Sequence, residues 1–435
     1  MITLMNGSST IALNPLTMLN KIFLTVLLII STDSREIEDN YQTDDNCRIS
    51  IEYKTGDFKE PQPLILSSEK KDTNFLYPND KNGYINIRPS RKINLACPGK
   101  KNHLQGIKGI INKREIQIKC IKKKIFTVND DNSIIFNITS VTCKYYPENI
   151  ARIMSTKCFN NSTYVEVGFS LENTFLRTIK LCYNSNNSLT YYTKFELTKN
   201  IGHSPSNYPR PRRWLSGEFY SGFDMDYLYK IKTQFDTVTM TVGSEELAKK
   251  YITAGTARYL SRGHMVAKAD FIYGNAQRST FWYINAAPQW QTFNGGNWNT
   301  LEGNVRSFAE KRLLNLHVYT GVHGQMKLID INNNLVPVYL FTNSTHRSIP
   351  VPQYYWKIIY DPVRKLGTAF VGLNDPYALE INDDMFLCTD IANKIKWLTW
   401  DANSIKKGVS YACTVDDLRK VIPSIPQLEV YGVLK

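Results

Sequence analysis

One short segment in the second half of the chain contains several side chains that could together do chemistry. Hydrolysis of a phosphodiester needs a neutral base that deprotonates water, and a histidine such as His264 is neutral near pH 7. It also needs a hard cation held by oxygen ligands, which the Asn294 amide and the Glu302 carboxylate could supply. Guanidinium groups hold phosphate through paired hydrogen bonds, and Arg262 and Arg306 belong to the same segment. The segment therefore contains the parts of a site that cleaves phosphodiesters.

The spacing of these residues supports their grouping. A helix is expected over 297–312, because apolar residues recur there at helical spacing, at Trp298, Leu301, Val305 and Phe308. Glu302 and Arg306 are four residues apart and therefore share one face of this helix, and Asn294 comes just before it. A strand–loop–helix unit could thus place the base and the metal ligand on opposite sides of one phosphate.

Each of these residues, taken singly, also has an ordinary structural explanation. A lone histidine such as His264 is more often a satisfied core residue than a base. Asn294 precedes two glycines and fits a turn, and Glu302 with Arg306 fits a surface ion pair. The functional interpretation therefore depends on the whole string of residues.

Three short motifs follow one another in this segment. They read Ser261-Arg262-Gly263-His264, then Asn285-Ala286-Ala287-Pro288-Gln289, then Asn294-Gly295-Gly296-Asn297-Trp298, continued by Leu301, Glu302 and Arg306. This string resembles the pattern of the DNA/RNA non-specific endonucleases, the ββα-metal (His-Me finger) family that includes Serratia nuclease and mitochondrial endonuclease G. The resemblance extends over residues 210–435, and the preceding part more loosely resembles that of secreted arthropod nucleases active on double-stranded RNA.

The resemblance implies a chemical role for three of these residues. His264 would be the general base, and activity should then decline on the acid side of its pKa. Asn294 would be the single direct protein ligand to Mg²⁺, with Mn²⁺ as a substitute, and Glu302 would hold metal-bound water in the outer shell. Many family members have Asp where this chain has Ser261. Because that Asp is not the base, we expect the chemistry to be retained with a changed local hydrogen bond.

The resemblance also implies how the substrate is held. Arg262 and Arg306 would bind phosphate, and Asn285 would orient either the substrate or the loop that carries the histidine. The substrate would be RNA, including double-stranded RNA, or DNA, contacted through its phosphate backbone and cut to 5′-phosphate ends. The preference among these polymers and the oligomeric state stay open.

The rest of the second half must position this segment. Ser244, followed by two glutamates, predicts the start of a helix that extends to about Ala254. The apolar run Thr280–Ile284 predicts a buried strand. Further strands are expected at Leu314–Thr320, Val336–Phe341, Tyr354–Tyr360 and Thr368–Leu373. The fold class is therefore α+β, with a mainly antiparallel sheet. The resemblance implies that residues 217–435 form a ββα-metal nuclease domain.

The first half of the chain has a different pattern of polar and apolar residues. Residues 36–200 contain short alternating stretches such as 164–169 and 189–192, broken by Asn, Gly and Pro. This pattern predicts a small β-rich domain that disulfides hold together. Residues 201–216 are rich in proline and arginine and are interpreted as a linker between the two domains.

The N-terminus predicts export. Lys21 precedes the nine apolar or small residues 22–30, and a polar stretch follows. This is the pattern of a secretory signal peptide, assigned to residues 1–33, although a signal anchor or a buried helix are alternatives. We expect a secreted, extracellular protein with no membrane association after cleavage.

The cysteines agree with an oxidising compartment. Six of the eight lie before residue 183 and two after residue 387, and no pair is spaced as in a zinc site. If each half closes its own bridges, Cys388 pairs with Cys413, whereas the first six allow 15 connectivities, among which Cys158–Cys182 is favoured. Glycosylation sequons begin at Asn137, Asn160, Asn161, Asn186 and Asn343.

Composition limits the classes of protein. With 435 residues, 42% of them hydrophobic, the chain can form two cores, which excludes wholesale disorder. Its single apolar run is too short for a polytopic membrane protein. The formal net charge of +14 favours a polyanionic partner, here nucleic acid. Two alternatives to an endonuclease remain: a non-catalytic binder of extracellular polyanions, and a phosphodiesterase that prefers small nucleotides.

Overall fold

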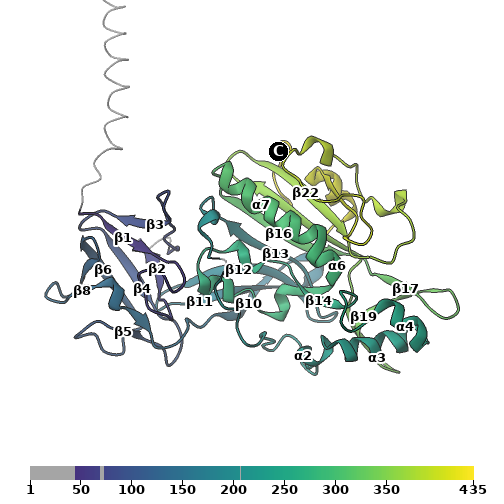
Figure 1. The fold of residues 1–435 in the computed structure, drawn as a ribbon, viewed down its shortest axis with the longest axis horizontal. Helices are drawn as coiled ribbons and strands as arrows, with labels where there is room; N and C mark the ends of the chain where they lie inside the picture. The colour runs from purple at the N-terminus through teal and green to yellow at the C-terminus, as the bar shows by residue number, and fades with distance from the viewer. Residues whose placement is uncertain (1–44, 69–72, 206) are drawn as a thin grey trace, which may run out of the picture.

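A computed structural model describes residues 45–68, 73–205 and 207–435 of the chain (Figure 1). The predicted signal peptide at 1–33 lies outside the described residues. No helix in the described ranges combines the length and the apolar character needed to cross a membrane.

The N-terminal part is a small β domain. Its main sheet has five antiparallel strands in the order β2-β4-β6-β7-β8, and two further pairs, β1–β3 and β5–β9, lie beside it. The strands are β1 (Cys47–Ser50), β2 (Leu64–Ser67), β3 (Tyr84–Ile87), β4 (Lys92–Ala96), β5 (Leu104–Gln105), β6 (Glu115–Lys122), β7 (Ile125–Val128), β8 (Ile135–Asn137) and β9 (Thr142–Cys143). Two disulfides, Cys47–Cys120 and Cys97–Cys143, cross-link this domain. The predicted disulfide-stapled β-rich domain is therefore present.

The larger part is built on one antiparallel sheet of eight strands. Their order is β10-β11-β12-β13-β16-β21-β22-β23. The strands are β10 (Ile150–Lys157), β11 (Thr163–Ser170), β12 (Phe175–Asn184), β13 (Leu189–Leu197), β16 (Leu316–His323), β21 (Tyr354–Asp361), β22 (Leu366–Leu373) and β23 (Ser410–Cys413). The remaining pairs are β14 (Leu260–His264) with β15 (Ala286–Trp290), β17 (Lys327–Ile329) with β18 (Leu335–Pro337), and β19 (Tyr339–Thr342) with β20 (Arg347–Pro350).

This sheet crosses the boundary that the sequence suggested at residue 200. β13 pairs with β16 along its length, with Phe195 opposite Val318, so β10–β13 belong to the larger sheet. The small domain therefore occupies only the part before β10. Alternating hydrophobicity predicted strands at 164–169 and 189–192, which lie within β11 and β13. It cannot indicate which sheet they join, because β13 pairs with a strand more than a hundred residues away.

Helices are few and mostly short. They are α2 (Met225–Leu228), α3 (Ile231–Val242), α4 (Glu245–Tyr251), α5 (Gly274–Arg278), α6 (Gln291–Phe293), α7 (Asn299–Lys311) and α8 (Val415–Val421). The predictions of α4 and α7 are confirmed, with the Ser244 hydroxyl capping α4. In Figure 1, α7 lies across one face of the large sheet, and its residues Leu301, Val305 and Phe308 are buried there. The α+β class with a mainly antiparallel sheet is confirmed.

One predicted strand is wrong. Residues 280–284 are buried, but they form a turn that leads into a 3₁₀ turn at Tyr283–Asn285, and the strand is β15 just after it. An apolar run shows burial without distinguishing a strand from a packed turn. The Asn285 amide closes this turn by donating to the carbonyl of Thr280 at 2.9 Å.

The two bridges expected from the cysteines, Cys158–Cys182 and Cys388–Cys413, are both present. The small domain also docks on the segment that follows β14. Phe75 stacks on Tyr273 with centroids 4.7 Å apart, and the Asn275 amide donates to the carbonyl of Gln62 at 2.9 Å. The small domain thereby supports the backbone between His264 and β15.

Candidate functional site

The site is built by two paired strands and the helix that follows them. β14 ends at His264, which pairs with Ala286 at the start of β15. The chain then passes through α6 and a π-helical turn (Asn294–Trp298) into α7. Within this turn Gly296 leaves the helical region, with φ −97° and ψ −121°. Such π turns often mark functional positions, and this one places Asn294 at the entry of α7.

Five of the predicted residues line one groove with a volume of about 1010 Å³, which we call the catalytic groove. They are Arg262, His264, Asn294, Glu302 and Arg306. Asn285 is instead fully buried behind the groove. Its side chain accepts from the backbone of Val266 at 3.1 Å and donates to the Val266 carbonyl at 3.0 Å, which fixes the chain just after His264.

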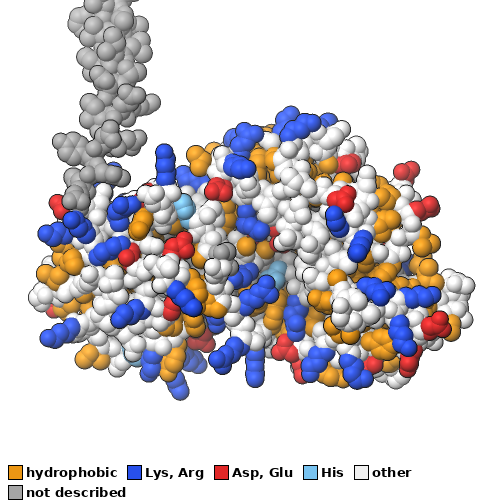
Figure 2. Space-filling view, viewed as in Figure 1, with side chains coloured by type: hydrophobic (Ala, Val, Ile, Leu, Met, Phe, Trp, Pro, Cys, Tyr) orange, Lys and Arg blue, Asp and Glu red, His pale blue; other side chains and the backbone are white. Residues whose placement is uncertain are grey.

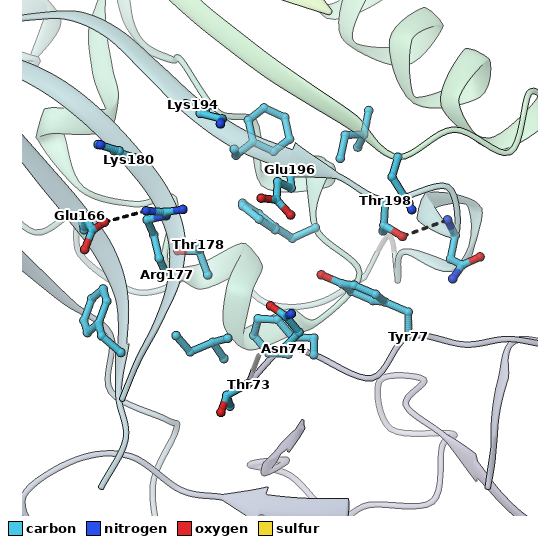
Figure 3. A pocket seen from close by; sticks show the side chains of 18 of the residues that line it. Thr73, Asn74, Tyr77, Glu166, Arg177, Thr178, Lys180, Lys194, Glu196 and Thr198 are labelled. Carbon is cyan, nitrogen blue, oxygen red and sulfur yellow. Dashed lines mark hydrogen bonds and ion pairs between the residues drawn. The ribbon is translucent and has the colours of Figure 1, made fainter. Parts of the chain in front are cut away.

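A separate pocket of about 600 Å³ lies between residues 73–77 and strands β12 and β13 (Figure 3). It contains none of the predicted site residues. Its buried carboxylate, Glu166, already pairs with Arg152 at 2.7 Å and Arg177 at 2.8 Å. The pocket therefore lacks the residues from which the chemistry was predicted.

His264 lies in an aromatic enclosure at one wall of the groove. Its ring centroid is 4.6 Å from that of Trp214 and 5.0 Å from that of Phe281. Its Nε2 atom is buried, and no described residue forms a hydrogen bond with it. Burial, and to a lesser extent the positive charge of Arg210, lowers the pKa of His264 to about 3. The imidazole is therefore neutral at physiological pH and has a nitrogen available to accept a proton.

Asn294 is oriented by the residue that departs from the family pattern. Its Nδ2 donates to Ser261 Oγ at 3.0 Å, and Ser261 Oγ donates to the carbonyl of Gln289 at 2.9 Å. With the amide nitrogen held in this way, no described residue donates to Asn294 Oδ1. That oxygen can serve as a ligand in the groove.

Glu302 belongs to a cluster of four charged side chains. Arg306 Nη1 donates to buried Asp270 at 2.8 Å, and Lys357 Nζ, which is also buried, donates to Thr320 Oγ1 at 2.6 Å. Burial and the negative charge of Asp270 raise the pKa of Glu302 to about 7, although Lys357 and Arg306 oppose this rise. Glu302 therefore changes its charge close to physiological pH.

Arg262 lies where the groove meets α2. Its Nη2 pairs with Asp226 at 3.0 Å, its Nε donates to Tyr283 Oη at 3.0 Å, and its guanidinium lies 4.8 Å from the ring centre of Tyr229. A guanidinium has five donors, so these contacts leave Nη1 for an anion. Arg306 likewise keeps donors beyond the one that bonds to Asp270.

Sequence reasoning missed several groups around the site. Trp214 and Arg210 come from the segment interpreted as a linker, which in fact forms a wall of the groove. Asp226 and Asp270 have no motif around them, and Lys357 follows an aromatic run that gave no sign of its burial. Only the fold brings these groups together.

The oxygen donors fit a hard, partly hydrated cation. In the described ranges no cluster of three or more His, Cys, Asp or Glu side chains could hold a metal. Asn294 and Glu302 instead offer one amide oxygen and one carboxylate in the same groove. Mg²⁺ commonly keeps several waters and takes one or two protein oxygens, so this donor set suits it better than zinc.

Gly263 allows β14 and β15 to approach closely. A Cβ at this position would lie 2.4 Å from Gln289 Oε1 and 2.9 Å from Tyr355 Oη. We expect Gly263→Ala to destabilise the protein by about 1–3 kcal/mol through overpacking, measured as a lower Tm. Gly303→Ala is the matched control, since nothing lies within 4 Å of a Cβ there and alanine favours the helix. Equal Tm values for the two variants would contradict the close approach.

Comparisons with known proteins identify the family of the chain. The model of the DNA/RNA non-specific endonuclease family matches residues 160–418, more than half of the chain. A salivary endonuclease of Lutzomyia longipalpis is 24% identical over 80% of this chain and 75% of its own length. Salivary protein Tsal2A of Glossina morsitans morsitans is 25% identical over 89% of this chain and 94% of its own.

A solved structure, that of the EndoG/EndoGI complex, contains a chain that is 18% identical to this one with a TM-score of 0.36. The match covers 59% of this chain and 87% of that chain. The family match begins at residue 160 and so includes β11, β12 and β13, which precede the suggested boundary and belong to the same sheet as β16. The chain belongs to the DNA/RNA non-specific endonuclease family and is a nuclease.

Proposed function

We propose that this nuclease is a secreted, Mg²⁺-dependent, sugar-non-specific endonuclease that cleaves RNA, including double-stranded RNA, and DNA to 5′-phosphate ends. The single observation that carries the proposal is the catalytic groove, where a neutral histidine faces the same space as Asn294 and Glu302. Two arginines, Arg262 and Arg306, border that space.

In this mechanism His264 takes a proton from a water molecule as the water oxygen forms a bond to phosphorus. The bond from phosphorus to the 3′ oxygen breaks, and this oxygen takes a proton from solvent. Mg²⁺, when bound, supplies positive charge beside the phosphoryl and leaving oxygens. Asn294 would ligate the cation and Glu302 would hold its water, while Arg262 and Arg306 neutralise the substrate phosphate. Asn285 would position the histidine loop through its hydrogen bonds to Val266.

Secretion is supported by two observations on the folded chain. All eight cysteines are paired in disulfides, as is usual in oxidising compartments. The asparagines of the five glycosylation sequons in the described ranges are exposed. The similar proteins from Lutzomyia and Glossina are named as salivary.

A gel assay of the purified protein on plasmid, single-stranded DNA and long double-stranded RNA tests the proposed activity. We expect internal cuts with Mg²⁺ on all three substrates and none with EDTA. Tight, salt-sensitive binding without cleavage under any condition would make the chain a capture protein instead. Cleavage of a dinucleotide but not of plasmid would make it a small-nucleotide phosphodiesterase.

The pKa of Glu302 predicts how the metal requirement depends on pH. The carboxylate is ionised above pH 7 and takes up a proton as the pH falls through about 7, so protons compete with Mg²⁺ below that value. We expect the Mg²⁺ concentration for half-maximal activity to rise about tenfold per pH unit below 7 and to be constant above it. Glu302→Gln should require a high Mg²⁺ concentration for half-maximal activity at every pH. Identical Mg²⁺ requirements of the unmodified protein at pH 6 and pH 8 would contradict this role.

A further inference from the structure

A second groove lies on the other side of α7 from the catalytic groove. It has a volume of about 770 Å³ and lies between the C-terminal half of α7 and residues 394–399. Five of its ten lining residues are cations and none is Asp or Glu; the cations are Lys311, Arg312, Lys394, Lys396 and Lys435. We call it the α7 cationic groove. A groove lined in this way attracts anions.

The positive charge of this groove is not neutralised by an Asp or Glu side chain within the described part of the chain. None of its five cations forms an ion pair with a described Asp or Glu, whereas Lys407 pairs with Asp401 nearby at 3.2 Å. Lys396 Nζ only donates to the carbonyl of Asn393, at 3.0 Å. Figure 2 shows Lys and Arg side chains gathered at the top of the molecule, over the end of α7 and the C-terminus.

The groove is preformed by contacts between α7 and the segment opposite. The Asn304 amide donates to Thr399 Oγ1 at 3.0 Å and accepts from the Thr399 backbone at 2.9 Å. Phe308 stacks on Trp397 with centroids 4.6 Å apart. The cations that would bind a ligand are therefore carried by two segments that are held rigidly against each other.

α7 separates the two grooves along its length. Glu302 and Arg306 point into the catalytic groove, Asn304 and Lys311 line the cationic groove, and Ser307 lines both. The helix has 13 residues and is therefore about 20 Å long, and with side chains it is about 10–12 Å across. The two grooves thus lie side by side, separated by the width of one helix.

We propose that the α7 cationic groove binds the phosphates of the complementary strand of a DNA duplex whose cleaved strand lies in the catalytic groove. The two backbones that flank the major groove of a DNA duplex are about 12 Å apart, which matches the width of α7. A single strand held in one groove would have to cross the helix to reach the other. The inference rests on the proposed function and adds a structural basis for cleavage of DNA duplexes.

The test removes three charges from this groove in the full chain, with Lys311→Gln, Lys394→Gln and Lys396→Gln combined. The matched control removes three exposed charges elsewhere, with Lys81→Gln, Lys232→Gln and Lys249→Gln combined. The substrates are one sequence as a duplex and as a single strand, and bis(p-nitrophenyl) phosphate. We expect the groove variant to lose at least about tenfold in kcat/KM on the duplex and to keep the other two activities within about twofold.

Binding measured in EDTA separates this inference from the proposed function, because it requires no cleavage. If three phosphate contacts are lost, the salt dependence of duplex affinity should become less steep by about 2.7 in log–log slope, about 0.9 for each contact. Equal losses on duplex and single strand would place the cleaved strand in this groove and overturn the inference. A duplex loss no larger than that of the control variant would also overturn it. If the unmodified protein does not cleave, but the groove variant still loses affinity for the duplex selectively, the proposed function is refuted and this inference stands.

Discussion

The substitution His264→Ala is expected to lower kcat by about 10²- to 10⁴-fold on plasmid and on double-stranded RNA, the range that general-base catalysis supplies. The physical reason is that the neutral imidazole is the proton acceptor in the groove, since no described residue forms a hydrogen bond with its buried Nε2. The measurement is single-turnover cleavage with saturating Mg²⁺, which reports the chemical step without product release.

His346→Ala is the matched control, since His346 is exposed and lies in the β19–β20 hairpin region outside the catalytic groove. It should retain full activity. The affinity of His264→Ala for nucleic acid in EDTA should stay within about twofold of the unmodified protein, because phosphate contacts dominate binding. A loss of less than about tenfold in the chemical step would assign the base to another group.

The environment of His264 also changes the pH dependence that its residue type suggests. An unperturbed histidine would become protonated, and so inactive as a base, near pH 6.5. Enclosure by Trp214 and Phe281 lowers the pKa of His264 to about 3, so the base stays unprotonated at all mildly acidic pH values. A decline in activity just below pH 7 would then result from protonation of Glu302, and a high Mg²⁺ concentration should reverse it.

The parts of the site that the sequence could predict are those that are local in the chain. The spacing of Glu302 and Arg306 on one turn, and of Asn294 just before it, fixes their placement once α7 forms. The apolar positions of α7 and the cap of α4 are equally local, and both helices are present. Local periodicity and capping were sufficient for these elements because they need no information on distant partners.

What the sequence could not predict depends on long-range pairing. Asp270 and Lys357 flank Glu302 only because the loop after β14 and strand β21 meet beside α7. Burial at this place is the main cause of the raised pKa of Glu302; the charge of Asp270 adds to the rise and that of Lys357 opposes it. Trp214 faces His264 because the supposed linker folds back over the groove. Residues 150–197 join a sheet whose other strands begin at 316. Neither the charges around Glu302 nor the limits of the sheet can be predicted from residues that are close in the sequence.

The second large effect is expected from Asn294→Ala, which removes the only side-chain amide proposed as a direct metal ligand. We expect Mg²⁺ affinity to fall by more than about 100-fold, beyond the loss typical of an outer-shell change, with activity falling in parallel. Isothermal titration calorimetry with Mg²⁺ and with Mn²⁺ measures this without relying on catalysis. The Tm of the variant should stay close to that of the unmodified protein, because among the described residues the Asn294 side chain forms only one hydrogen bond, to Ser261.

Ser261→Ala distinguishes the ligand from the residue that orients it. Ser261 Oγ holds the nitrogen side of the Asn294 amide and is itself anchored on the Gln289 carbonyl, so its loss frees the amide to rotate. We expect this variant to lose about 10-fold in Mg²⁺ affinity, less than Asn294→Ala, while excess Mg²⁺ restores its kcat. If Ser261→Ala were as severe as Asn294→Ala and excess Mg²⁺ did not rescue it, the serine itself would be the ligand. If neither variant changed Mg²⁺ affinity, the cation would bind elsewhere, and the family role carried over to Asn294 would be wrong for this chain.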